Sequence, residues 1–118
     1  MPIVRIDHVQ LAMPAGGEDT ARNFYGRILG ISEVPKPPEL QKRGGVWFES
    51  GIVKIHLGVD PNFRPAKKAH PGLAVRELRG LVQQLRSEGF EVIDDENAPG
   101  VYRVYVTDPF GNRLELME

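Results

Sequence analysis

The sequence contains no cysteine, no long apolar run and no excess of charge of either sign. The absence of cysteine excludes disulfides, thiolate metal ligands and a cysteine nucleophile. No apolar run approaches the roughly 18 residues of a membrane span, so we expect no membrane segment. With 15 basic and 16 acidic residues, the formal net charge is −1. Because nucleic-acid binding needs a basic surface, we expect no nucleic-acid partner.

The 118 residues are 41% hydrophobic and 26% charged, which is typical of a folded globular protein. This length predicts a single domain over 1–118. The 13 glycines and 10 prolines predict short elements separated by many turns. Residues 1–7 lack the apolar core of an export signal, so we expect a cytoplasmic protein.

The order of expected elements occurs twice along the chain. Apolar alternation and helical spacing predict a strand, a helix and three strands in the first half, at 3–13, 18–29, 31–34, 45–49 and 52–59. The same order is predicted in the second half, at 70–75, 76–88, 90–93, 101–107 and 112–117. The sequence therefore predicts an α+β fold of two tandem βαβββ modules, at about 1–60 and 69–118.

Short matches between the two halves support a repeat. The pattern H-x-x-L-A begins at His8 and again at His70. Gly30 and Gly89 each follow a helical stripe, where a left-handed cap with positive φ is expected. His56 and Glu115 lie at the same distance beyond these two glycines. The repeat thus pairs His8 with His70, and His56 with Glu115.

All three histidines of the chain therefore occupy repeat-related positions, and the fourth position holds Glu115. Imidazole and carboxylate together are the ligand set of Fe, Ni, Mn, Co or Zn. His56 and Glu115 alternate with apolar residues, so both should lie on the strand face away from the helices. The residues alone leave two interpretations open: a metal site, or histidines and a carboxylate with structural or surface roles.

Four segments of the chain resemble the vicinal oxygen chelate superfamily, which includes glyoxalases, bleomycin-resistance proteins and extradiol dioxygenases. These segments are 7–12, 23–30, 70–75 and 107–116, and the last one is the most specific. The resemblance implies that the paired modules curl into a curved, U-shaped mixed sheet with the helices on its outer face. It also implies a divalent metal held by His8, His70 and Glu115. His56 falls in the remaining ligand position, where the family uses Glu or Gln, so it is either a fourth ligand or a base facing the substrate.

Further candidates lie close to these positions. Arg103 and Tyr105 share one face of a predicted strand, and similar positions in the family contact substrate; an exposed charge and a half-buried aromatic ring are the alternatives. Lys54 shares a face with His56. Trp47 lies in the neighbouring strand, and for this residue packing in the core is the alternative. We expect Trp47, Lys54, Arg103 and Tyr105 to bind substrate.

The resemblance implies a metal-dependent enzyme in which the metal chelates two adjacent oxygens of a small substrate. Glu115 and His56 are the expected catalytic residues, with Glu115 a ligand that also moves a proton. Lyase, isomerase, thiol transferase and dioxygenase reactions stay open. The alternative is a non-catalytic protein that sequesters a small molecule or antibiotic, as bleomycin-resistance proteins do. Because the family pairs its modules edge to edge or across subunits, we expect a homodimer.

Overall fold

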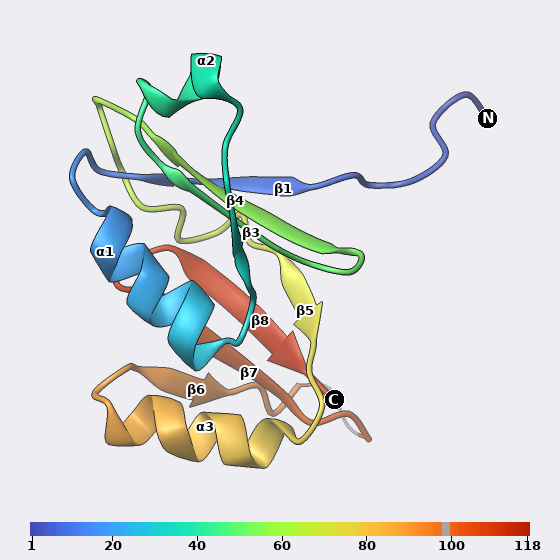
Figure 1. Ribbon diagram of the computed structural model, residues 1–118. Helices are drawn as coiled ribbons and strands as arrows, with labels where there is room; N and C mark the ends of the chain where they lie inside the picture. The colour runs from blue at the N-terminus through green and yellow to red at the C-terminus, as the bar shows by residue number, and fades with distance from the viewer. Residues whose placement is uncertain (98–99) are drawn as a thin grey trace. The chain divides into compact units, whose positions relative to one another are not determined.

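The computed structural model of the protein describes residues 1–97 and 100–118. The chain divides into two compact units, Met1–Phe63 and Arg64–Glu118, and each unit is built around one four-stranded sheet (Figure 1). In these described ranges, no helix has the length and apolar character needed to cross a membrane.

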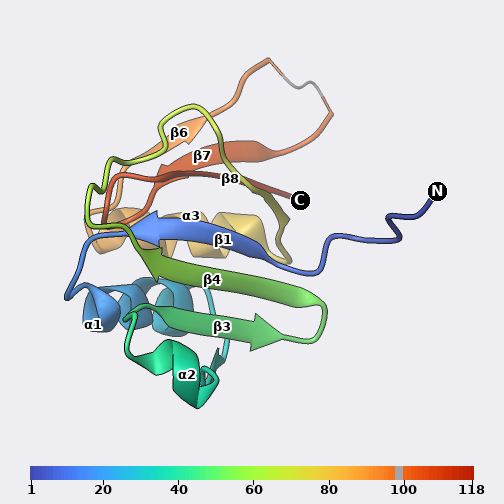
Figure 2. The ribbon, with the colours of Figure 1, turned by 90° about the horizontal axis from the view of Figure 1, so that it is seen from above.

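The first unit contains four strands and three short helical segments. In chain order they are β1 (Val9–Met13), α1 (Glu18–Ala21), η1 (Arg22–Ile28), β2 (Glu33–Val34), α2 (Pro38–Gln41), β3 (Val46–Ser50) and β4 (Val53–Val59). The strand order in the sheet is β1-β4-β3-β2. β1 is parallel to β4, and the other two pairings are antiparallel, so β4 lies between β1 and β3 (Figure 2).

The second unit repeats this topology. Its elements are β5 (Gly72–Ala74), α3 (Leu78–Ser87), β6 (Val92–Asp94), β7 (Arg103–Thr107) and β8 (Arg113–Met117). The strand order is β5-β8-β7-β6, with β5 parallel to β8 and the other pairings antiparallel. The predicted α+β class and the two tandem βαβββ modules are therefore confirmed.

The core of the first unit lies between its helical segment and one face of its sheet. Phe24 and Tyr25 of η1 are fully buried. The ring of Tyr25 lies 5.8 Å from that of Phe48 on β3, and Phe48 is opposite Ile55 on β4. The predicted helix over 18–29 is confirmed in place, but from Arg22 onward it is a π-helix.

In the second unit, α3 covers the corresponding face. Leu78, Val82 and Leu85 of this helix are buried. The guanidinium of Arg79 lies 4.4 Å from the ring centre of Tyr102, just before β7. Side chains alternate along a strand, so Arg103, Tyr105 and the Glu115 opposite Tyr105 lie on the face away from α3. The strand face predicted for Glu115 is confirmed.

Both predicted glycine caps are confirmed, because φ is 77° at Gly30 and 89° at Gly89. The predicted turn between the last two strands is also confirmed. The backbone N–H of Gly111 donates to the carbonyl of Asp108 at 3.0 Å. The Asp108 carboxylate accepts the backbone N–H groups of Phe110 and Asn112, which fixes the register of β7 against β8.

Some predicted boundaries were wrong. The strand predicted over 3–13 begins only at Val9, and residues 1–8 belong to no strand. Val9 pairs with Ile55, and β4 begins only two residues earlier, after the turn at Gly51. The first residues of the chain therefore have no residue in β4 with which they could pair. Other predicted elements begin later than expected: β5, α3, β6, β7 and β8 start at Gly72, Leu78, Val92, Arg103 and Arg113.

Gly45, just before β3, has a conformation that only glycine adopts easily. Its φ is 88°, and a Cβ atom there would lie 2.3 Å from the carbonyl oxygen of Leu57. We expect Gly45→Ala to lower the free energy of unfolding by about 3 kcal/mol or more, because backbone strain and a clash add together. Urea unfolding measures this.

Gly51 is the matched control for that substitution. Its φ is 60°, and a Cβ atom there would meet nothing within 4 Å. Gly51→Ala should therefore cost only about 1 kcal/mol, from backbone strain alone. Equal losses for the two variants would contradict the close approach of Gly45 to β4.

Candidate functional site

The first unit gathers its predicted site residues on the sheet face away from the core. His56 in β4 is opposite Gln10 in β1 and opposite Trp47 in β3. Its neighbour Ile55 is buried on the helix-covered face. His56 therefore points away from the helix, as the alternation predicted, yet only 5% of it is exposed.

His56 is covered by two other rings. The rings of Trp47 and His56 are stacked with centroids 4.0 Å apart and planes inclined by 5°. His8 also stacks on His56, with centroids 4.4 Å apart and planes inclined by 20°. Trp47 belongs to β3, and His8 directly precedes β1. These two strands lie on either side of β4, so the His56 ring lies between the rings of Trp47 and His8. Trp47 is thus on the site face and not in the core.

Carboxylates determine which ring nitrogen carries hydrogen in each of these histidines. His56 Nε2 lies 2.8 Å from Glu49 Oε2, and His8 Nδ1 lies 3.0 Å from Asp7 Oδ2. A carboxylate only accepts hydrogen bonds, so these two nitrogens donate. The hydrogen bond from His8, and next the charge of Lys54 3.8 Å away, hold the pKa of Asp7 below its ordinary value. In the neutral rings, the lone pairs are on His8 Nε2 and His56 Nδ1.

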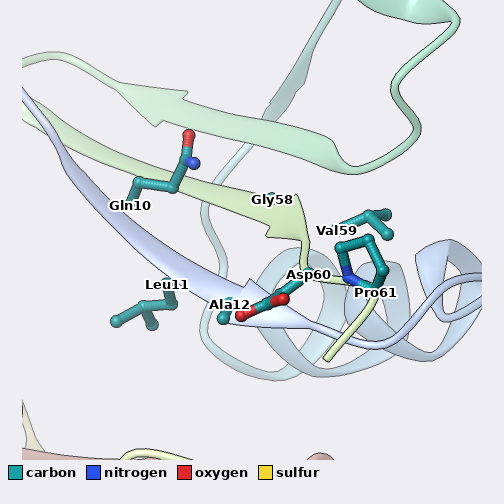
Figure 3. Close-up of a pocket in the computed structure, with 7 residues that line it drawn as sticks. All are labelled: Gln10, Leu11, Ala12, Gly58, Val59, Asp60 and Pro61. Carbon is teal, nitrogen blue, oxygen red and sulfur yellow. The ribbon is translucent and has the colours of Figure 1, made fainter. Parts of the chain in front are cut away.

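A shallow pocket of about 380 Å³ lies at the carboxyl ends of β1 and β4 (Figure 3). It is lined by Gln10, Leu11, Ala12, Gly58, Val59, Asp60 and Pro61. Gln10 and Leu11 point to opposite sides of β1 in Figure 3. A Cβ atom at Gly58 would lie 2.5 Å from the Gln10 amide nitrogen, so the glycine leaves room for that amide beside the His56 position.

The second unit brings His70 and Glu115 together. His70 Nε2 lies 2.9 Å from Glu115 Oε1, and His70 Nδ1 lies 2.7 Å from the backbone carbonyl of Lys68. A carbonyl only accepts, so Nδ1 carries hydrogen, and in the neutral ring Nε2 has a lone pair directed at a carboxylate. Both contacts are favourable together only with a proton or a metal cation between Nε2 and Glu115.

The spacing of this pair fits a metal ion. With bonds of about 2.1 Å, two adjacent ligands of an octahedral ion are about 3.0 Å apart, close to the 2.9 Å observed. A histidine that donates its other ring N–H to a backbone carbonyl is also the usual arrangement of a metal ligand. His70 and Glu115 therefore fit a divalent transition metal in both donor type and geometry.

Two arginines and a tyrosine complete this cluster. Arg103 Nε lies 2.9 Å from Glu115 Oε2, but its N–H makes no hydrogen bond to any described residue and is buried. Tyr105 meets His70 edge to face at 5.6 Å, and the Arg113 guanidinium lies 3.7 Å from the Tyr105 ring centre. The buried Nε–H of Arg103 is available to an oxygen of a bound molecule.

The structure thus divides the predicted site residues between the two units. His8, Trp47, Lys54 and His56 gather in the first, and His70, Arg103, Tyr105 and Glu115 in the second. Within the described ranges, no three His, Asp or Glu side chains are grouped so that they could hold a metal ion.

Sequence reasoning missed the partners that orient the histidines. These are Asp7, Glu49 and the carbonyl of Lys68. Glu49 had a usable signal, because the tight turn at Ser50–Gly51 places it opposite Lys54 and diagonally across the hairpin from His56. The carbonyl of Lys68 had none, since any residue provides one.

The chain belongs to the Glyoxalase/Bleomycin resistance protein/Dioxygenase superfamily, whose family model matches residues 5–116. Among solved structures, it is similar to a glyoxalase family protein from Bacillus anthracis, with 55% identity and a TM-score of 0.93. That match covers 98% of this chain and 95% of the other. None of the curated proteins compared with the sequence matches it.

More distant solved structures share the fold. A glyoxalase/dioxygenase from Nostoc punctiforme is 20% identical with a TM-score of 0.74, and the match covers 96% of this chain and 90% of the other. The fosfomycin resistance protein FosX from Listeria monocytogenes is 16% identical with a TM-score of 0.76, covering 98% and 93%. At these identities the likeness concerns the fold alone.

Proposed function

We propose that the protein is a metal-dependent enzyme in which His8, His70 and Glu115 hold a divalent metal. The observation that carries this proposal is the His70–Glu115 pair: Nδ1–H donates to the Lys68 carbonyl, and Nε2 lies 2.9 Å from a carboxylate oxygen. A divalent metal held by Nε2 and this carboxylate would make both contacts favourable, as a proton on Nε2 also would. Members of this superfamily generally use divalent metals, which supports the proposal.

His8 is the third proposed ligand, because its hydrogen bonding matches that of His70. In both residues an acceptor takes the Nδ1–H, so Nε2 is the nitrogen that could bind a metal. The register also relates them: His8 lies two residues before the partner of His56, and His70 two residues before the partner of Glu115. The metal is Fe, Ni, Zn, Mn or Co, the ions that prefer imidazole with carboxylate.

A bound metal would act as a Lewis acid on two adjacent oxygens of a small substrate and stabilise negative charge on them. Arg103 would donate its unused Nε–H to a substrate oxygen, and Tyr105 would form a wall beside it. Lys54 and Trp47 line the face that carries His56. Glu115 would bind metal and hold a proton during the reaction. Lyase, isomerase, thiol transferase and dioxygenase chemistry all use such a site.

The ligand set is tested by removing one ligand. We expect Glu115→Ala to weaken binding of Zn²⁺ or Ni²⁺ by about 100-fold or more and to abolish metal-dependent activity, with the fold retained. Isothermal titration of chelator-treated protein measures affinity, and circular dichroism checks the fold. Asp94→Ala removes a half-exposed carboxylate of β6 in the same unit and is the matched control. Unchanged affinity in Glu115→Ala would exclude this ligand.

Measuring turnover distinguishes an enzyme from a protein that only sequesters its ligand. A panel of diketone–thiol adducts, catechols and acyl-CoA esters, each with Fe, Ni, Zn or Mn, should yield metal-dependent product formation. Tight binding of a small molecule without turnover, by protein purified free of metal, would favour a protein that sequesters its ligand, as bleomycin-resistance proteins do.

We also propose a homodimer, supported by the chain before β1. Residues 1–8 are extended, belong to no strand and continue past the β3–β4 turn (Figure 2). Ile3, Val4 and Ile6 in this segment are 75%, 86% and 80% exposed. Extended backbone with exposed apolar side chains is a surface that a second copy can cover.

Replacing Ile3, Val4 and Ile6 together by Ser should raise the dimer dissociation constant by about tenfold or more, because apolar area is no longer buried on association. Ile52→Ser is the matched control, since Ile52 is 96% exposed at the β3–β4 turn. Sedimentation velocity at micromolar concentration measures both. A monomeric unmodified protein, or a triple variant that dimerises normally, would contradict the proposal.

A further inference from the structure

His56 is the one histidine for which sequence reasoning left two roles open, ligand or substrate-facing group. We propose that Glu49 is a positioning residue that holds His56 as its Nε2–H tautomer, so that His56 offers the Nδ1 lone pair to the substrate and does not bind the metal. This inference rests on the proposed function, because it concerns the same site.

The first step is the hydrogen bond. Glu49 comes from β3 and reaches diagonally across to β4, where its Oε2 lies 2.8 Å from His56 Nε2. Because the carboxylate accepts, Nε2 carries the hydrogen and Nδ1 of the neutral ring is an acceptor. Among the residues that the structure describes, the hydrogen bond to the His56 ring is this one, at Nε2. A substrate group that meets this nitrogen is therefore a donor: a hydroxyl, a thiol or an N–H.

The second step is the ring stack. Trp47 lies nearly parallel to His56 at 4.0 Å, and His8 covers it at 4.4 Å. A ring clamped between two others cannot turn about its Cβ–Cγ bond without displacing them. Glu49 thus selects the tautomer, and the two neighbouring rings keep the imidazole plane fixed.

The third step concerns metal geometry. A metal bound by an imidazole lies near the plane of the ring, along the nitrogen lone pair. The planes of His8 and His56 are stacked and inclined by only 20°. The two ring planes therefore intersect only at a distance from the rings much longer than a metal–nitrogen bond of about 2.1 Å. In this arrangement one ion cannot bind both rings, so His8 as a ligand leaves His56 outside the coordination shell.

The two modules would then use equivalent positions differently. Glu115 in β8 and His56 in β4 are related by the repeat, because their β5 and β1 partners follow His70 and His8 by the same interval. Glu115 faces the imidazole of His70, whereas His56 faces the carboxylate of Glu49. One position would bind the metal, and the other would present a hydrogen-bond acceptor to the substrate.

Nitrogen NMR of the whole metal-free chain tests the positioning role. With only three histidines, the His56 signals are identified by their loss in His56→Gln. For the neutral His56 ring we expect a protonated Nε2 and an unprotonated Nδ1. Glu49→Ala should give mixed tautomers. Glu49→Gln should restore the Nε2–H form, because the amide oxygen also accepts.

Glu33→Ala is the matched control, because Glu33 lies on β2 of the same sheet and pairs with Arg22. It should leave the His56 signals unchanged. A purely structural role for Glu49 would lower stability without moving the tautomer equilibrium. A proton on Nδ1 in the unmodified protein, or an unchanged tautomer in Glu49→Ala, would overturn the inference.

Zn²⁺ titration separates this inference from the proposed function. His56→Gln should bind Zn²⁺ within about threefold of the unmodified protein, whereas Glu115→Ala should lose about 100-fold or more. An equal loss in His56→Gln would make His56 a ligand, which overturns this inference and leaves the metal site standing. If the unmodified protein binds no metal, the proposed function fails, and the NMR result alone decides whether Glu49 positions His56.

Discussion

The register of the parallel strand pair in each unit is the constraint on which the rest of the site depends. Gln10 pairs with His56, and Gly72 pairs with Glu115. Because side chains alternate along a strand, a shift of one residue would turn His56 or Glu115 into the core. The antiparallel neighbours, β3 and β7, then bring Trp47 and Tyr105 to the same faces.

Each histidine of the chain is oriented by an acceptor close to it. The acceptors differ in kind: the carboxylates of Asp7 and Glu49, and the backbone carbonyl of Lys68. The acceptor decides which ring nitrogen carries hydrogen, so in a neutral ring the lone pair has a defined direction. The chemistry of the site therefore depends as much on these acceptors as on the histidines, because the other tautomer would place its lone pair on the other ring nitrogen.

Local sequence signals predicted much of the fold. Gly30 and Gly89 have the positive φ expected of helix caps, and the turn from Asp108 to Gly111 forms as its residues indicate. The strand predicted over 3–13 was longer than the observed β1, because alternation of apolar residues does not reveal where a partner strand ends. The short helix Pro38–Gln41 was missed, since a proline cluster marks a turn as readily as a helix start.

The sequence by itself determined the repeat, the strand faces and which residues could carry chemistry, because these follow from periodicity and residue type. Only the tertiary structure decided which atoms meet. It placed Glu49 against His56, stacked His8 and Trp47 on that ring, and left the Nε–H of Arg103 buried without an acceptor among the described residues. Such contacts depend on distances and angles between separate strands, and residue spacing along one chain does not contain them.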